Sequence, residues 1–142
     1  MLWNASILRN STPRPLLGRG KVLVVNEDRG DLAHYRAMLQ RTGWRVVACG
    51  SYPEASICLE SEPFDLVVVS QGGCAFEGRP ALMRAIDLNR ERPVVVVTRS
   101  LDMGCYLEAM RLGAADYMEE PVSEEEISRA AAPSSRFRTA AA

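Results

Sequence analysis

The sequence predicts an α/β fold in which helices cover both faces of a parallel sheet, and three observations lead to this prediction. Short apolar runs typical of strands alternate five times with segments that show helical periodicity. The strongest runs, VLVV at 22–25 and VVVV at 94–97, are apolar at every position, as expected of strands buried on both faces. The length of 142 residues fits one domain with a core and is too short for two.

The first strand–helix unit runs from Lys21 to Gly43. The apolar run at 22–25 predicts a buried strand. The apolar residues of the following helix recur at helical spacing and are Leu32, Tyr35, Met38 and Leu39. Gly43 is a natural residue to end this helix, because glycine adopts the left-handed conformation that closes many helices.

The second unit begins with a short strand at Arg45–Cys49. Ser51 and Glu54 have the spacing of a capping box, which predicts the start of a helix. Pro63 ends that helix, because proline cannot continue the hydrogen-bond pattern. The third strand is expected at Asp65–Ser70 (DLVVVS), and the loop that follows it contains several glycines.

The next two elements are a helix and a strand of the same kind. The helix is marked by apolar residues at helical spacing, namely Leu82, Met83 and Ile86. Val94–Thr98 predicts the fourth strand. Asp102 can cap a fourth helix that runs through Met110 and is closed by Gly113.

The last unit is the weakest. Asp116–Met118 predicts the fifth strand, and Ser123 with Glu126 forms a second capping box. The fifth helix has Ile127 as its single large apolar residue before Pro133.

These units define the domain organisation: residues 1–20 are expected to be a leader outside the core, 21–132 the domain and 133–142 a tail. The alternation predicts a three-layer α/β/α fold with a five-stranded parallel sheet, and the flavodoxin-like strand order 2-1-3-4-5 is preferred. The functional crevice of such a sheet lies at the carboxyl ends of its strands. The polar residues expected there are Asn26, Glu27, Asp28, Ser70, Gln71, Thr98, Arg99, Glu119 and Glu120.

Composition narrows the function classes. The net charge of −1 indicates neither a nucleic-acid partner nor a membrane surface. No apolar run reaches the ~18 residues of a membrane span. The four cysteines form no CxxC pair and His34 is the one histidine, so neither a disulfide framework nor a zinc site is expected. We therefore expect a cytoplasmic protein with reduced thiols.

Several motifs, in the right order, resemble those of the receiver (CheY-like) domains of two-component response regulators. Thr98 and Glu120 stand 22 residues apart, which is the family's spacing. The Glu-Pro pair that ends the last motif stands where receivers have Lys-Pro, a bond that is often cis. The motifs are VLVVNED at 22–28, FDL at 64–66, Gly78, VVVVT at 94–98 and GAADYMEEP at 113–121.

The resemblance implies a phosphorylation site, and the residues imply that this site is degenerate. In the family an Asp after the third strand accepts a phosphoryl group, two acids help hold Mg²⁺, and a Thr or Ser and a Lys contact the phosphate. The matching positions here are Asn26, Glu27, Ser70, Thr98 and Glu120. The chain thus resembles an atypical receiver that lacks the phosphoacceptor Asp and the Lys.

The chemistry of these residues argues against phosphoryl transfer. The Ser70 hydroxyl would need a general base, and the one histidine, His34, is expected on the first helix. Glu120 reverses a charge that contributes about 4 kcal/mol at 4 Å and an effective dielectric near 20. Glu27 is the one matched metal ligand, and Glu120 could add a second carboxylate, so we expect no cofactor beyond weakly held Mg²⁺. No nucleophile–base pair is present, so no enzymatic activity is expected.

Four residues each allow two interpretations. Thr98 is expected to bond the local backbone rather than a phosphate. Gly72 and Gly73 either admit an anion to backbone N–H groups or let the loop turn, and the turn is preferred. Tyr117 occupies the position of the family's switch aromatic and is equally well explained as an aromatic at the edge of the core.

The function that follows is a stand-alone, phosphorylation-independent receiver that acts by protein–protein interaction. In the family the surface of the fourth helix, fifth strand and fifth helix carries most contacts. We therefore expect a signalling partner or a second copy to dock on the exposed sides of 101–112 and 116–127, with Glu108, Arg111 and Tyr117 on this face.

Two alternatives remain open at this point. The first is a phosphorelay receiver whose degraded pocket still works. The second, of a different class, is a small-ligand or redox sensor that reuses the crevice, with Cys74 as the redox-active thiol.

Overall fold

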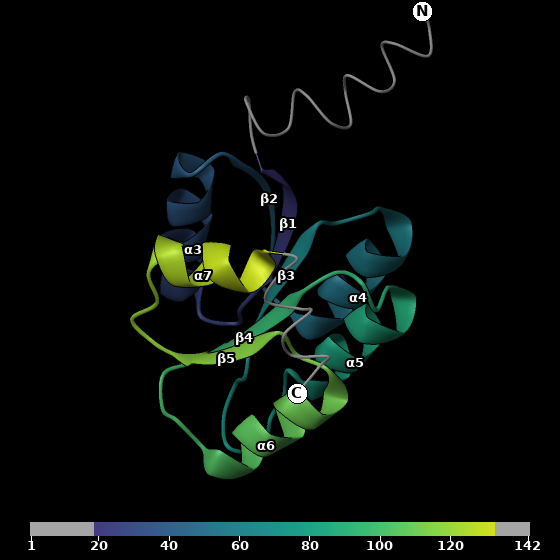
Figure 1. Ribbon diagram of the computed structural model, residues 1–142, viewed down its shortest axis with the longest axis vertical. Helices are drawn as coiled ribbons and strands as arrows, with labels where there is room; N and C mark the ends of the chain where they lie inside the picture. Colours follow the sequence, from purple (N-terminus) through teal and green to yellow (C-terminus); the bar gives the residue numbers. More distant parts are fainter. Residues whose placement is uncertain (1–18, 133–142) are drawn as a thin grey trace, which may run out of the picture.

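The computed structural model describes residues 19–132, and these form one parallel sheet with helices on both faces (Figure 1). The expected leader lies outside the described residues apart from Arg19 and Gly20, and the expected tail lies wholly outside them. In chain order the elements are β1 Gly20–Val25, α3 Arg29–Arg41, β2 Trp44–Cys49, α4 Tyr52–Ser61, β3 Leu66–Ser70, α5 Arg79–Leu88, β4 Val94–Thr98, α6 Met103–Leu112, β5 Asp116–Glu119 and α7 Glu124–Ala131.

The strand order is β2-β1-β3-β4-β5, with every neighbouring pair parallel. This confirms the predicted fold class and the flavodoxin-like order. The buried strands β3 and β4 are valine-rich because both of their faces are covered. All five carboxyl ends lie at one edge of the sheet, which is therefore the edge that can carry a site.

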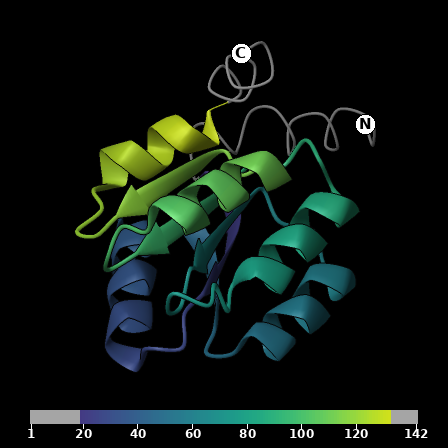
Figure 2. The ribbon, with the colours of Figure 1, turned by 90° about the horizontal axis from the view of Figure 1, so that it is seen from below.

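The core consists of two layers of side chains, one on each face of the sheet (Figures 1 and 2). On one face α4, α5 and α6 pack on the strands, through residues such as Leu59, Leu82 and Ala109. On the other face α3 and α7 pack on the strands, through Tyr35, Leu39 and Ile127. Ile127 is fully buried, which explains how a helix with one large apolar residue is held.

The helix caps follow the sequence closely, with one correction. Ser123 and Glu126 form the full capping box predicted for α7. At α4 the predicted box is only half formed: the Ser51 hydroxyl accepts from the Glu54 N–H, but the Glu54 carboxylate accepts from the N–H of Gly50 rather than from that of Ser51. The extended backbone of Ser51 still starts the helix where predicted.

Four strand bounds differ from the prediction by one or two residues. β1 begins at Gly20, inside the expected leader, and β2 begins at Trp44. β3 begins at Leu66, because Asp65 uses its side chain to accept from the Lys21 N–H. β5 extends to Glu119. Within residues 19–132, no helix combines the length and the apolar character needed to cross a membrane.

Candidate functional site

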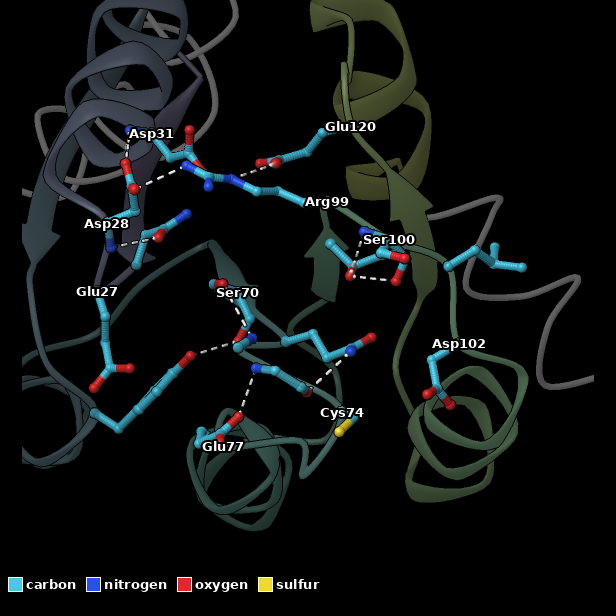
Figure 3. Close-up of a pocket in the computed structure, with 17 residues that line it drawn as sticks. Glu27, Asp28, Asp31, Ser70, Cys74, Glu77, Arg99, Ser100, Asp102 and Glu120 are labelled. Carbon is cyan, nitrogen blue, oxygen red and sulfur yellow. Dashed lines mark hydrogen bonds and ion pairs between the residues drawn. The ribbon is translucent and has the colours of Figure 1, made fainter.

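A cavity of about 400 Å³ lies at the carboxyl ends of the strands (Figure 3). Six carboxylates and one guanidinium are among its lining residues, so the described part of the cavity is strongly acidic. The residues that line it are Asn26, Glu27, Asp28, Asp31, Tyr52, Ser70, Gln71, Gly72, Gly73, Cys74, Glu77, Thr98, Arg99, Ser100, Leu101, Asp102 and Glu120.

The structure brings together all five positions that the sequence singled out. Asn26, Glu27, Ser70, Thr98 and Glu120 line the same cavity, although they come from four different strands or strand ends. The parallel sheet explains this, because the carboxyl ends of its strands meet at one edge. The Glu120–Pro121 bond beside the cavity is cis, as in the motif that the sequence resembles.

Arg99 organises the acids on one side of the cavity. We call this group the cation half, and it consists of Asp28, Asp31, Arg99 and Glu120. The Arg99 guanidinium lies 2.8 Å from Asp28 Oδ2 and 3.0 Å from Asp31 Oδ2. A Glu120 carboxylate oxygen lies 4.0 Å from Arg99 Nε, and the other oxygen accepts a hydrogen bond of 2.6 Å from the Tyr35 hydroxyl. Figure 3 shows Arg99 reaching from the end of β4 across the cavity to these acids.

Two side chains in or next to the cation half have shifted pKa values, and each shift has a physical cause. Asp28 caps α3, and the backbone N–H of Asp31 together with Arg99 holds the pKa of the Asp28 carboxyl below its usual value. Burial, with the Glu120 carboxylate beside it, raises the pKa of the Tyr35 hydroxyl. Since the Arg99 side chain is 64% exposed, its ion pairs set the orientation of the acids more than they stabilise the fold.

The opposite side is a compact loop, and we call it the loop half: residues 70–78. The Gly73 N–H donates to Glu77 Oε1 at 2.6 Å, and the Gly72 N–H donates to the Ser70 hydroxyl at 3.2 Å. Both amides are therefore occupied within the chain, which favours the turn interpretation of the two glycines over an anion site. The Ser70 carbonyl accepts from the Tyr52 hydroxyl at 3.0 Å.

Gly78 closes the loop half by close approach. A Cβ at this position would lie 2.1 Å from the Ser70 carbonyl oxygen, far inside any real contact. The Gly78 N–H also donates to the Gln71 carbonyl at 3.0 Å. The glycine matched to the family motif is thus required by the fold of this loop, whatever the chemistry of the site.

The hydroxyls of Thr98 and Tyr117 are both held by hydrogen bonds within the chain. The Thr98 hydroxyl donates to the Ser100 carbonyl at 2.9 Å and accepts from the Ser100 N–H, which confirms that it bonds the local backbone. The Tyr117 ring is buried, and its hydroxyl donates to Gln71 Oε1 and accepts from the Asp102 N–H. Burial raises the pKa of the Tyr117 hydroxyl. Tyr117 is thus held inward by partners from β3 and from the start of α6.

The residues present do not fit a Mg²⁺ site. Asn26 supplies an amide whose oxygen accepts from the Asp28 N–H, and the carboxylate of Glu27 points away from Arg99 (Figure 3). Glu120, the expected second carboxylate, is engaged elsewhere in this arrangement, since its oxygens face Arg99 and the Tyr35 hydroxyl. Across residues 19–132, no group of three or more His, Cys, Asp or Glu side chains is placed to hold a metal ion.

The sequence reasoning missed three functional positions. Arg99 was placed at the edge of the sheet without a role, Asp31 was not singled out, and Tyr35 was assigned only to the core face of the first helix. The spacing of Asp28 and Asp31 at the start of α3 is a local signal for two acids near one helix N-terminus. Nothing local identifies their partner, since 68 residues separate Asp31 from Arg99.

Comparisons with known proteins agree with this architecture. No protein-family model matches the chain. It is 28% identical over 114 residues to the alginate biosynthesis transcriptional regulatory protein AlgB of Pseudomonas aeruginosa, which covers 80% of this chain and 25% of AlgB. It is 26% identical over 106 residues to the transcriptional regulatory protein ZraR of Escherichia coli K12, which covers 75% of this chain and 24% of ZraR. The chain thus spans about a quarter of the length of these relatives.

Solved structures show the same fold. A response regulator protein from Burkholderia pseudomallei with a phosphorylated aspartic acid matches with a TM-score of 0.74 at 21% identity, over 85% of this chain and 71% of that one. A CheY-like receiver domain protein from Methanospirillum hungatei matches with a TM-score of 0.72 at 20% identity, over 85% of this chain and 96% of that one. With its β2-β1-β3-β4-β5 sheet, the chain has the fold of the CheY-like receiver domains of response regulators.

Proposed function

We propose that this chain is an atypical receiver of two-component signalling that works in the cytoplasm by protein–protein interaction and without phosphorylation. The observation that carries this proposal is the position of Arg99. Its guanidinium lies between Asp28 and Asp31 and faces Glu120, so the acids of the pocket already share a cation that belongs to the chain. A permanent internal cation removes the need for Mg²⁺ and leaves no counter-charge free for a phosphoryl group.

The phosphoacceptor position supports the same proposal. Ser70 carries a hydroxyl that accepts from the Gly72 N–H, and none of the residues that line the cavity is a histidine. A serine without a general base is a weak nucleophile. The acidic residues around it repel an incoming phosphoryl donor. A receiver that is never phosphorylated does not have to switch between two conformations. The inward Tyr117, whose hydroxyl is hydrogen-bonded to two partners, is consistent with a single conformation.

The outer surface of α6 supports interaction as the output. Met103 and Leu107 lie one turn apart on the exposed side of α6, Tyr106 flanks them next to β5, and Leu101 precedes the helix. All four are exposed, Leu107 to 59%. A helix that is apolar on its inner and its outer face is typical of one that buries both. We therefore place the docking surface on α6 and the neighbouring β5, where the Tyr106 ring packs edge-on against Tyr117.

The sequence analysis placed Glu108 and Arg111 on this surface, but they are unsuitable positions for mutations that test docking. Glu108 accepts from Arg79 of α5 at 2.7 Å and from Arg111 at 2.8 Å, so it faces α5 rather than β5. The two arginines hold the pKa of the Glu108 carboxyl below its usual value. A charge reversal at Glu108 would break internal ion pairs, whereas Leu107 can be changed without touching them.

The relatives set the context of the proposal. AlgB and ZraR are transcriptional regulatory proteins by name, and the chain matches about a quarter of each. We propose that this chain takes part in signalling of the same general kind, as the regulatory part, through contacts with a partner protein or a second copy. No nucleic-acid or membrane contact is proposed for residues 19–132.

Phosphorylation independence is tested with a small phosphodonor. The protein is incubated with acetyl phosphate and Mg²⁺ and its intact mass is measured, and in parallel beryllofluoride is titrated while amide NMR shifts are followed. We expect an unchanged mass and no saturable shifts at Ser70, Thr98 or Tyr117. A stable phosphoryl adduct, or saturable shifts at these residues, would replace the proposal with a phosphorelay receiver.

The docking surface is tested with a matched pair of variants. Leu107→Glu on α6 and Ile57→Glu on α4 each place a charge at an exposed apolar position, the second on a different helix and 67% exposed. We expect Leu107→Glu to abolish capture of a partner, or self-association in sedimentation, and Ile57→Glu to leave it intact. Equal binding by both variants would remove α6 from the proposal.

A further inference from the structure

Two cysteines that are nine positions apart in the sequence meet in space. The Sγ atoms of Cys49 and Cys58 lie 3.6 Å apart, and both thiols are free. Cys49 is the last residue of β2, and Cys58 lies in the second turn of α4. The sequence analysis treated each as an isolated small hydrophobe, because spacing alone does not show that the strand and the helix turn them toward each other.

We propose that Cys49 and Cys58 are an oxidation site that closes to a disulfide when the protein meets a hydroperoxide. A disulfide needs the two sulfurs to approach by roughly 1.5 Å, to the usual length of about 2.05 Å. Rotation about the Cα–Cβ bond of either cysteine moves its sulfur over this range. The position of Cys49 also favours a small shift of the backbone, because its strand β2 lies at the edge of the sheet and pairs with β1 alone.

The order of the two steps follows from exposure. Cys58 is half-buried and Cys49 is buried, so the peroxide reaches the Cys58 sulfur first. The Cys58 thiolate attacks the peroxide, the O–O bond breaks, and a Cys58 sulfenic acid and hydroxide form. The Cys49 sulfur then attacks this sulfenic acid, the S–O bond breaks, and water leaves. The net reaction converts two thiols and one hydrogen peroxide into one disulfide and two waters.

The surroundings of Cys49 support its role as the second thiol. Burial, with the Cys58 thiol beside it, raises the pKa of Cys49 to about 12, so this sulfur stays protonated at neutral pH. The buried Cys49 thiol is therefore less reactive toward peroxide than a more exposed cysteine, which leaves the first step to Cys58. Cys74 is exposed, and Cys105 is buried with its thiol directed at the Cys74 carbonyl, so neither of them is placed like the Cys49–Cys58 pair.

The disulfide would join two elements that both reach the pocket. The Cys49 carbonyl accepts from the Asn26 N–H at 3.1 Å, and Tyr52 in the first turn of α4 donates to the Ser70 carbonyl. A bridge between β2 and α4 therefore constrains the rim of the cavity near Asn26 and the loop half. Oxidation is expected to be visible in the amide resonances of Asn26 and Gly72.

The test uses a chain in which only the proposed pair can react. In a Cys74→Ser, Cys105→Ala background, hydrogen peroxide is added and the peptide that contains both cysteines is weighed without reduction. We expect a loss of about 2 Da, for two hydrogens, and its reversal by dithiothreitol. Adding Cys49→Ala should abolish the loss and leave Cys58 as a sulfenic or higher oxide.

The wild-type chain provides a second measurement that does not depend on the folding of the background. Its peptides are mapped after peroxide, and the Cys49–Cys58 link is compared with oxidation at Cys74. We expect the intramolecular link together with shifts at Asn26 and Gly72. Oxidation of Cys74 with Cys49 and Cys58 still alkylatable after denaturation would overturn the proposal, as would a link that forms only in urea.

Discussion

The two halves of the pocket are held by opposite kinds of contact. Within the loop half the hydrogen bonds between residues 70–78 join near neighbours, such as Gly73 to Glu77 and Gly72 to Ser70, over seven residues or fewer. In the cation half Arg99 contacts Asp31 across 68 residues, and Tyr35 contacts Glu120 across 85. The loop half is thus a local structure, and the cation half exists only once the sheet has assembled.

This difference separates what each half does. The amides of Gly72 and Gly73 in the loop half are both used in hydrogen bonds within the loop, and Gly78 leaves no room for a side chain. The ion pairs of the cation half all involve Arg99, whose side chain is 64% exposed, so they contribute little to stability. Tyr117 ties the loop half to the start of α6, since its hydroxyl donates to Gln71 and accepts from the Asp102 N–H.

The loop half should be broken most severely by Gly78→Ala. The added Cβ would lie 2.1 Å from the Ser70 carbonyl oxygen, so the β3–α5 loop must move. We expect a loss of about 3 kcal/mol in the free energy of unfolding, measured by urea denaturation. Gly50→Ala in the β2–α4 loop is the control, because its Cβ meets nothing within 4 Å, and it should change stability by less than about 1 kcal/mol. Similar losses in both variants would contradict the close-approach argument.

The connection between the loop half and α6 is tested by Tyr117→Phe. Removing the hydroxyl leaves the buried Gln71 amide oxygen and the Asp102 N–H without this partner, and we expect a loss of about 1 to 2 kcal/mol. Tyr106→Phe on the exposed side of α6 is the matched change and should cost less than about 0.5 kcal/mol. If both variants unfold at the wild-type denaturant concentration, the Tyr117 hydroxyl does not tie the loop half to α6.

The cation half is tested by Arg99→Gln. We expect only a small loss of stability, because the guanidinium is mostly exposed, but a gain in divalent-cation binding, because Asp28 and Asp31 lose their shared cation. The measurement is the rise in melting temperature with added Mg²⁺ or Ca²⁺, relative to wild type. The control is Arg36→Gln, which changes an exposed arginine of α3 outside the cation half and should behave as wild type. An Arg99→Gln protein that ignores both cations would mean that Arg99 does not take the place of a metal.

The smallest expected effect is a pH dependence that belongs to the cation half alone. The pKa of Asp28 is lowered in the folded state, so its stabilising contribution is present above the ordinary value of 3.8 and is lost as the pH falls through the folded value. Asp28→Asn keeps a helix-capping side chain but removes the titration. We expect the stability difference between wild type and this variant to shrink between about pH 6 and pH 2. A constant difference would show that folding does not lower the pKa of Asp28.

Much of the fold was predictable because its signals are local. The valine runs identify β3 and β4, Asp102 and Ser123 mark the helix starts, and Gly113 adopts the left-handed conformation that ends α6. The errors were also small, namely one or two residues at a strand end or half of a capping box. At the site, Thr98 bonds its own loop as predicted, since that contact spans two residues.

The sequence by itself determined the α/β alternation and the set of polar residues at the carboxyl ends of the strands, because periodicity, caps and strand composition act over a few residues. Only the tertiary structure decided which of these residues meet. It directed Arg99 onto Asp28 and Asp31, turned Glu120 toward Tyr35, and placed Cys49 against Cys58. Side-chain direction and reach across a packed sheet depend on all the strands at once, and no local pattern in the chain encodes them.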